Sequence, residues 1–237
     1  MNVFKNIFGV EPGLIKEKCV LVPCLNKELL TGFGVKEPVR GKIYGCAQGK
    51  NFTLIHARIG ACFIGDLVLY LKETSCCEVY LFGSCGSTGE LGIGRLVMPM
   101  KCFARESFSA LLDEMDKGPW PVFYPDHDLC EGFQKSLDSH GVDKRSCMTL
   151  ASLKLEEGLT QYFKDLDVDV VDMECSAFFA ASSKIGLKAL ALFYVSDIIH
   201  QKPFYAELNE SDQQAAKAGM KDGIKFLCDF LQKNSNG

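Results

Sequence analysis

The chain has 237 residues, 47% of them hydrophobic and 24% charged, and a formal net charge of −4 at pH 7. A chain of this length and composition can fold as one domain, residues 1–237, around a sizeable core. The slightly acidic balance, without a run of Lys or Arg, argues against a nucleic-acid partner, because phosphate contacts require clustered cations. Its apolar stretches fall far short of the ~20 residues that cross a membrane, so no membrane partner is expected either.

Short helical and strand patterns begin at the N-terminus. Residues 3–8 predict an amphipathic turn that packs against the domain or against a neighbouring subunit. From there onward, apolar segments of strand length alternate with helical patterns. The predicted strands cover residues 19–23, 52–57, 78–82, 95–98, 168–173 and 187–195, and the predicted helices cover 61–73, 128–139 and 174–185. Gly141 and Gly186 stand where the last two of these helices would end.

Two further segments complete the chain. Residues 100–127, which are rich in Phe and Pro, predict a long excursion beside the sheet. Ser211 and Gln214 have the spacing of a helix capping box, and the apolar residues between 220 and 231 form one stripe. The alternation of strands and helices predicts an α/β fold: a single domain with a mixed, mostly parallel central sheet and helices on both faces.

Twelve cysteines are spread along the chain, and none forms a Cys-x-x-Cys pair. This spacing lacks the signature of a zinc or thioredoxin-type site, so no bound metal is expected. Free thiols in apolar segments behave as small hydrophobic residues and are typical of a reducing compartment. Charged residues also interrupt the first 24 residues, which do not resemble a secretion signal. We therefore expect a cytoplasmic protein.

Three residue clusters follow predicted strands, where ligands bind in folds of this kind. The first is Gly83-Ser84-Cys85-Gly86, directly after the strand 78–82. Glycines let backbone N–H groups approach an anion or a sugar closely, and Ser84 adds a hydroxyl. The same residues would also suit a tight structural turn.

The second cluster is Met173-Glu174, where a strand runs straight into a helix. A carboxylate at Glu174 can accept two hydrogen bonds from a vicinal diol such as the ribose 2′ and 3′ hydroxyls. An acid at a helix N-terminus is also favoured by the helix dipole alone.

The third cluster is Ser196-Asp197, at the end of the most apolar strand. A buried acid is costly unless it is hydrogen-bonded or used in chemistry. A carboxylic acid at this place can protonate a purine ring nitrogen as the base departs.

In this order and spacing the clusters resemble the nucleoside phosphorylase family, which includes purine nucleoside phosphorylases and methylthioadenosine/adenosylhomocysteine nucleosidases. The resemblance runs from about residue 19 to residue 231, and Ile59-Gly60-Ala61 is similar to the family's glycine turn. It implies an enzyme that cleaves the bond between a nucleobase and its ribose, acts on a small nucleoside, needs no resident cofactor and assembles as a homo-oligomer.

The resemblance also implies roles for individual residues. Glu174 would hold the ribose hydroxyls, Met173 would pack on the sugar or base, and Asp197 would protonate the leaving base. Gly83, Ser84 and Ser196 would contact the substrate beside them. An acid rather than an amide at position 197 favours a purine over uridine.

The phosphate site of the family's phosphorylases is incomplete in this chain. Phosphate binding calls for arginine and backbone donors. Leu81 occupies the position of a family arginine, and residues 23–24 that of a family glycine. The cations that could substitute are Lys50, Arg58 and Arg105, so phosphate stays open as a co-substrate.

The family's nucleosidases use a glutamate after the first strand to activate water. Alignment of residues 23–28 puts Glu28 at that position, which favours hydrolysis slightly, although a surface glutamate near a helix start has the same pattern. A non-catalytic binding or storage relative of the same fold is a further alternative, but it would require neither Glu174 nor Asp197. Leu153 replaces an aromatic residue that stacks on the base in relatives, so the base stays undefined.

Overall fold

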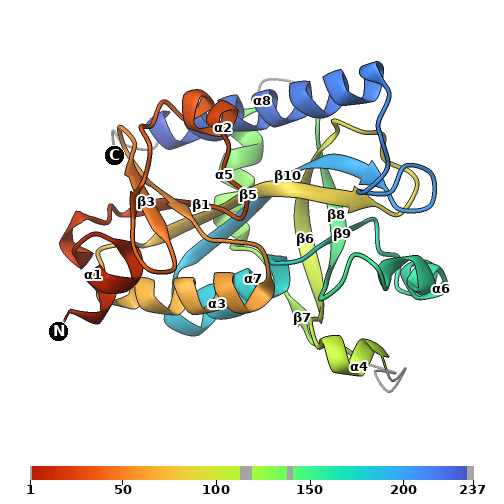
Figure 1. Ribbon diagram of the computed structural model, residues 1–237, viewed down its shortest axis with the longest axis horizontal. Helices are drawn as coiled ribbons and strands as arrows, with labels where there is room; N and C mark the ends of the chain where they lie inside the picture. Colours follow the sequence, from red (N-terminus) through yellow and green to blue (C-terminus); the bar gives the residue numbers. More distant parts are fainter. Residues whose placement is uncertain (1, 113–118, 138–140, 234–237) are drawn as a thin grey trace.

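The computed structural model describes residues 2–112, 119–137 and 141–233 (Figure 1). Within these residues ten strands form one sheet. The strands are β1 (Lys18–Val22), β2 (Val39–Arg40), β3 (Gly45–Gln48), β4 (Thr53–His56), β5 (Glu78–Ser87), β6 (Leu96–Arg105), β7 (Val122–Phe123), β8 (Val142–Leu150), β9 (Val170–Asp172) and β10 (Lys188–Ile198).

The helices of the same residues are α1 (Val3–Phe8), α2 (Lys27–Gly32), α3 (Ala61–Tyr70), α4 (Phe108–Leu112), α5 (His127–Ser136), α6 (Thr160–Asp165), α7 (Cys175–Ile185) and α8 (Glu210–Lys233). Three short 3-10 helices are added by η1 (Pro12–Leu14), η2 (Leu71–Glu73) and η3 (Glu156–Leu159). Among these residues no helix combines the length and the apolar character that a membrane crossing requires.

The strand order is β10-β6-β8-β9-β5-β1-β4-β3-β2, with β7 beside β6. β10 also pairs with β5, so five strands (β5, β10, β6, β8 and β9) close into a ring. The longest ladders, β10 with β5 and β6 with β8, are parallel, whereas β10–β6, β5–β9 and the β2–β3–β4 edge are antiparallel. The predicted single α/β domain with a mixed, mostly parallel sheet is confirmed.

Helices cover the sheet on both faces, as the apolar strands predict (Figure 1). α3 and α7 lie side by side on one face, where Ile64 and Phe178 belong to one buried cluster. α2, α5 and α8 cover the other face, where Phe133 and Ile224 belong to a second cluster. A third cluster around Phe163 lies under α4 and α6. Burying side chains of this size contributes about 1.5–3 kcal/mol each.

Both chain ends carry the expected helices, with one difference in capping. The predicted turn at residues 3–8 is α1, and its Phe4 and Phe8 are buried. The C-terminal helix α8 begins at Glu210, before the expected Ser211 cap. Asn209 holds this helix start instead, because its Oδ1 accepts a hydrogen bond from the backbone N–H of Asp212 at 2.9 Å.

The central part of the chain differs more from the prediction. β6 continues to Arg105, so residues 100–105 are strand rather than excursion, and residues 113–118 lie outside the described residues. β8 was not predicted, because the charged run Asp143-Lys144-Arg145 in its first half hides the apolar pattern. The helix expected at 128–139 leaves helical geometry at Leu137, so Gly141 does not cap it, and residues 138–140 are outside the described part. Gly186 caps α7 as predicted, with φ +78°.

Candidate active site

The later halves of β5 and β10 and the end of β9 surround a cavity of ≈ 330 Å³. This volume lies in the range of small-molecule sites. Six residues that the sequence analysis expects to contact or protonate the substrate line it: Gly83, Ser84, Met173, Glu174, Ser196 and Asp197. Residues from three separate stretches of sequence are therefore brought together around one space.

Asp197 reaches the cavity through an irregularity in the β5–β10 ladder. Val195 pairs with Cys85 and Asp197 with Gly86, so Ser196 is an extra residue in β10. Bulges of this kind re-aim side chains beside functional sites. The Ser196 hydroxyl donates to Oδ1 of Asp197 at 2.6 Å. A Cβ on Gly86 would lie 2.8 Å from Oδ2 of Asp197, so a larger residue there would displace this carboxyl group from its observed position.

Glu174 follows β9 and lies at the start of α7. Its Oε1 accepts a hydrogen bond of 2.6 Å from the backbone N–H of Gly60. Gly60 has φ +116°, a conformation that side-chain-bearing residues rarely adopt. The glycine turn that the sequence singled out therefore orients the Glu174 carboxyl group.

Asp172 fixes the chain that carries Glu174. Its Oδ2 accepts hydrogen bonds from the backbone N–H groups of Glu174 (2.8 Å) and Cys175 (2.5 Å). Its Oδ1 accepts another from the Thr149 hydroxyl at 2.6 Å. These bonds satisfy N–H groups at the start of α7 that no helical carbonyl reaches. The position of Glu174 is thus set by a buried network rather than by a flexible loop.

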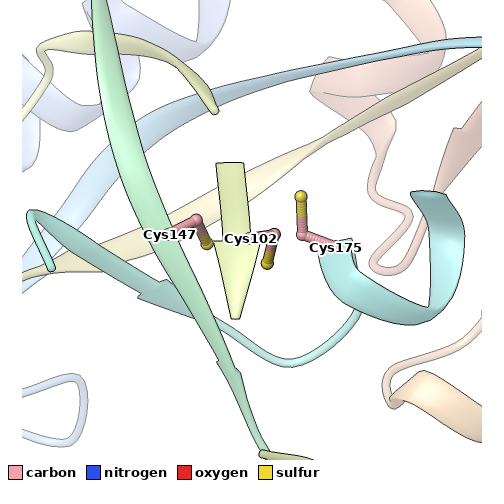
Figure 2. Close-up of side chains that lie close together, drawn as sticks. All are labelled: Cys102, Cys147 and Cys175. Atoms are coloured by element: carbon pink, nitrogen blue, oxygen red, sulfur yellow. The ribbon is translucent and has the colours of Figure 1, made fainter. Parts of the chain in front are cut away.

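Three buried cysteines lie below this network: Cys102 on β6, Cys147 on β8 and Cys175 on α7 (Figure 2). Their sulfur atoms lie within 4.8 Å of one another. The Cys102 sulfur also lies 3.3 Å from the Thr149 hydroxyl, and the Cys147 thiol donates to Asp172 at 3.5 Å. Burial raises the pKa of the Cys147 and Cys175 thiols, which favours the neutral form. At Cys102 the effect of burial is outweighed by hydrogen bonds from Cys147, Cys175 and Thr149, which lower the pKa of its thiol. The three thiols therefore pack against the Asp172 network, and all twelve cysteines of the chain are free.

Both candidate acids have a pKa above the ordinary value of their residue type. Asp197 is 5% exposed and Glu174 is 6% exposed. Burial raises the pKa of Asp197, and burial raises the pKa of Glu174 to about 7. A carboxyl group that keeps its proton near neutral pH can donate it to a substrate. The arrangement can therefore supply a general acid and a hydrogen-bonding carboxyl group in one cavity.

The cavity wall also contains Glu156, Tyr194 and Phe204, to which the sequence analysis gives no role. Glu156, in η3, is 2% exposed, and within the described chain its Oε1 has no hydrogen-bond partner. Tyr194 and Phe204 supply aromatic rings at the cavity, where Leu153 offers an aliphatic side chain. No local pattern distinguishes Glu156 from its neighbour Glu157. A glutamate shortly after a strand that reaches the cavity would have been the signal, but β8 itself was not predicted.

Glu28 does not lie at the cavity, contrary to the expectation. Asn26 caps α2 by accepting a hydrogen bond from the Leu29 N–H at 2.8 Å, and the helix then turns Leu29 toward the cavity and Glu28 away from it. Glu28 lines a groove beside α8 and forms an ion pair of 2.5 Å with Lys217. The helix start therefore decides which side chain faces the cavity.

The three candidate phosphate cations also lie outside the cavity lining. Lys50 is exposed in the turn between β3 and β4. Arg58 donates from Nε to the carbonyl of Ile43 at 2.6 Å. Arg105 is buried, with its guanidinium group 4.9 Å from the Trp120 ring centroid and 4.6 Å from that of Tyr162. The guanidinium group of Arg105 therefore packs against aromatic rings of neighbouring segments and does not reach the cavity.

The fold is similar to that of several solved enzymes. A uridine phosphorylase from Vibrio fischeri superposes with a TM-score of 0.74 at 18% identity, over 93% of each chain. A 5′-methylthioadenosine/S-adenosylhomocysteine nucleosidase from Neisseria meningitidis gives a TM-score of 0.72 at 17% identity, over 92% of this chain and 99% of that one. An AMP nucleosidase from Bacteroides thetaiotaomicron gives 0.69 at 13% identity, over 100% and 97%.

Comparison with curated proteins gave no match. The sequence pattern described as the phosphorylase superfamily matches residues 26–232, which is most of the chain. The predicted resemblance is therefore confirmed at the level of the family. The chain belongs to the phosphorylase superfamily.

Proposed function

We propose that this protein cleaves the N-glycosidic bond of a purine nucleoside by hydrolysis. The observation that carries the proposal is that Asp197 and Glu174 line one cavity, both buried and both with a raised pKa. Membership of the phosphorylase superfamily supports this class of reaction. Two of the three similar structures described above are nucleosidases by name, and the third is a phosphorylase.

In the proposed reaction Asp197 donates its proton to a ring nitrogen of the base. The electron pair of the glycosidic bond passes to the base, which leaves as a neutral molecule, and positive charge develops on the ribose. Water then adds to the C1′ carbon, giving free ribose, and the proton that it releases passes through solvent to restore the Asp197 carboxyl group. Glu174 holds the ribose hydroxyls, and its carboxyl group stabilises the cationic sugar electrostatically.

The choice of water rests on the charge of the cavity. Among the residues that the structure describes, no Lys or Arg lines it, whereas four carboxyl side chains do: Glu156, Asp172, Glu174 and Asp197. Phosphate is an anion that needs cationic or N–H donors. A wall of this composition disfavours phosphate and leaves water as the acceptor, with no part for Glu28, Lys50, Arg58 or Arg105.

The test is an incubation of phosphate-free protein with adenosine, inosine, guanosine and uridine, with and without added phosphate. We expect purine release without phosphate, and ribose rather than ribose 1-phosphate as the sugar product. Strict dependence on phosphate would return the protein to the phosphorylases. Binding of nucleosides without any cleavage would make it a non-catalytic relative. The homo-oligomeric state and the cytoplasmic location stay predictions, which light scattering and fractionation can test.

A further inference from the structure

Glu156 is a buried acid that the mechanism above does not use. It lies in η3, the short helix after β8, and its side chain lines the cavity together with Asp197. The residue is 2% exposed, and its Oε1 has no hydrogen-bond partner among the residues described. A buried polar atom without a partner costs free energy, so its presence in a cavity wall points to a ligand that completes it.

The surroundings of Glu156 are acidic. Asp197, on β10, lines the same cavity as Glu156. Glu157 is the neighbour of Glu156 in η3, and Lys154 partly neutralises Glu157 at 3.4 Å. Asp172 and Glu174 line the same cavity. No cation is among the described residues of the lining, so nothing there offsets a negative charge on Glu156. Burial first, and the charge of Asp197 second, raise the pKa of Glu156 to about 7.

We propose that Glu156 selects the base: its carboxyl group holds the Watson–Crick edge of a 6-aminopurine, donating to ring N1 and accepting from the N6 amino group. The proposal rests on the nucleoside-cleaving function proposed above and adds the substrate class to it.

The match is one of donors and acceptors. A neutral carboxyl group carries one donor and one acceptor side by side. A 6-aminopurine presents the complementary pair, with ring N1 as acceptor and the amino group as donor. A 6-oxopurine presents N1–H as donor and a carbonyl oxygen as acceptor instead. Its donor and acceptor are therefore exchanged relative to those of a 6-aminopurine. Asp197 takes the imidazole side of the ring, and Glu156 takes the opposite, six-membered side.

A binding experiment on the free bases tests the proposal without relying on turnover. Isothermal titration of the whole protein with adenine and with hypoxanthine at pH 6 should show adenine tighter by about 10- to 100-fold, as expected for two hydrogen bonds. Glu156→Ala should remove that preference, because it should weaken the binding of adenine and leave that of hypoxanthine unchanged. Glu157→Gln, a change at the half-buried neighbour, which does not line the cavity, is the matched control and should leave the preference intact.

Glu156→Gln sharpens the test, because an amide also places one donor beside one acceptor. This variant should bind adenine with an affinity within about threefold of wild type at pH 6. Its affinity for adenine should be the same at pH 8 as at pH 6. Wild-type affinity for adenine should instead fall about tenfold between pH 6 and pH 8, as the carboxyl group ionises near pH 7.

Three outcomes would overturn the proposal: a wild-type protein that binds neither base, a preference for hypoxanthine, or an adenine preference that survives Glu156→Ala. Circular dichroism of each variant shows whether it is folded. If the protein binds adenine through Glu156 but cleaves no nucleoside, only the proposed hydrolysis fails. If it cleaves nucleosides without regard to Glu156, only the present inference fails.

Discussion

Two parts of the cavity wall, the β9–α7 junction and the η3 segment, hold buried acids in different ways. At the junction, Asp172 accepts hydrogen bonds from two backbone N–H groups and from Thr149, and Glu174 accepts one from Gly60. In η3, the Oε1 of Glu156 has no such partner in the described chain. Both regions are buried to a similar degree, so the difference lies in hydrogen bonding rather than in exposure.

The comparison separates two uses of a buried carboxyl group. A fully satisfied network fixes geometry, because removing any member leaves the others unpaired. An unsatisfied acid costs stability, and that cost is recovered only when a ligand or a proton arrives. The junction therefore fixes the position of Glu174, whereas the stability of η3 depends on whether a ligand or a proton binds to Glu156. Each of the following changes tests one side of this contrast.

The largest effect is expected at the junction, for Asp172→Ala. The change leaves the N–H groups of Glu174 and Cys175 and the Thr149 hydroxyl without their acceptor, so the free energy of unfolding should fall by about 3 kcal/mol. Urea denaturation measures this fall. Asp165→Ala, on the exposed surface of α6, is the control and should change little. A loss at Asp172 no larger than that of the control would mean that the network does not hold the junction.

Asp197→Asn should lower turnover by at least about 10²-fold, because an amide cannot donate the proton that a general acid supplies. The side chain keeps its shape and its acceptor for the Ser196 hydroxyl, so the unfolding midpoint should stay close to that of wild type. Steady-state kinetics on any nucleoside that the wild type cleaves gives the comparison. Wild-type turnover in this variant would remove Asp197 from the mechanism.

Glu156→Gln should stabilise the empty protein, in a pH-dependent way. The pKa of Glu156 rises on folding from an ordinary 4.5 to about 7, so the folded state loses stability as the pH increases from 4.5 to 7. Removing the charge should therefore gain about 1–3 kcal/mol at pH 8 and almost nothing at pH 4. Denaturant unfolding at both pH values measures it. An equal effect at the two values would contradict a buried, unpaired acid.

The smallest effect is expected for Glu174→Gln, compared between ribonucleosides and 2′-deoxyribonucleosides. The amide offers one acceptor where the carboxylate offers two, so kcat/KM should fall about tenfold more for substrates that carry the 2′ hydroxyl. The deoxy substrates serve as the internal control for folding and for the chemical step. Equal losses for both substrate series would show that Glu174 does not contact that hydroxyl.

Local sequence predicts the residues whose position depends only on where a strand ends. Ser84 and Asp197 lie in the later halves of β5 and β10, which run parallel, so their side chains reach the same edge of the sheet. Glu174 follows β9, which pairs with β5 in the antiparallel sense. β5 runs on to Ser87, so residues 83–86 are strand and not the loop after a strand that ends at residue 82. The order of these clusters along the chain was enough to identify the family. The Gly60 turn was also recognisable, because its backbone conformation requires glycine.

Positions that depend on one helical step or on distant contacts could not be predicted. Each residue of a helix is turned by about 100° from the one before, so the start of α2 decided between Leu29 and Glu28. Arg105 is enclosed by Trp120 and Tyr162, which come from two other segments. Glu156 reaches the cavity only because β8 brings the following segment there, and charged residues conceal that strand in the sequence.

The closed ring of strands has a consequence for how the chain is made. β10 (Lys188–Ile198) closes the ring by pairing with β5, which precedes it by about a hundred residues. Until β10 leaves the ribosome, β5 and β6 each lack a neighbour that they have in the finished sheet. Unpaired strand edges invite association with other chains. Because the same strand carries Asp197, the step that protects the nascent chain from aggregation is also the step that brings Asp197 to the cavity.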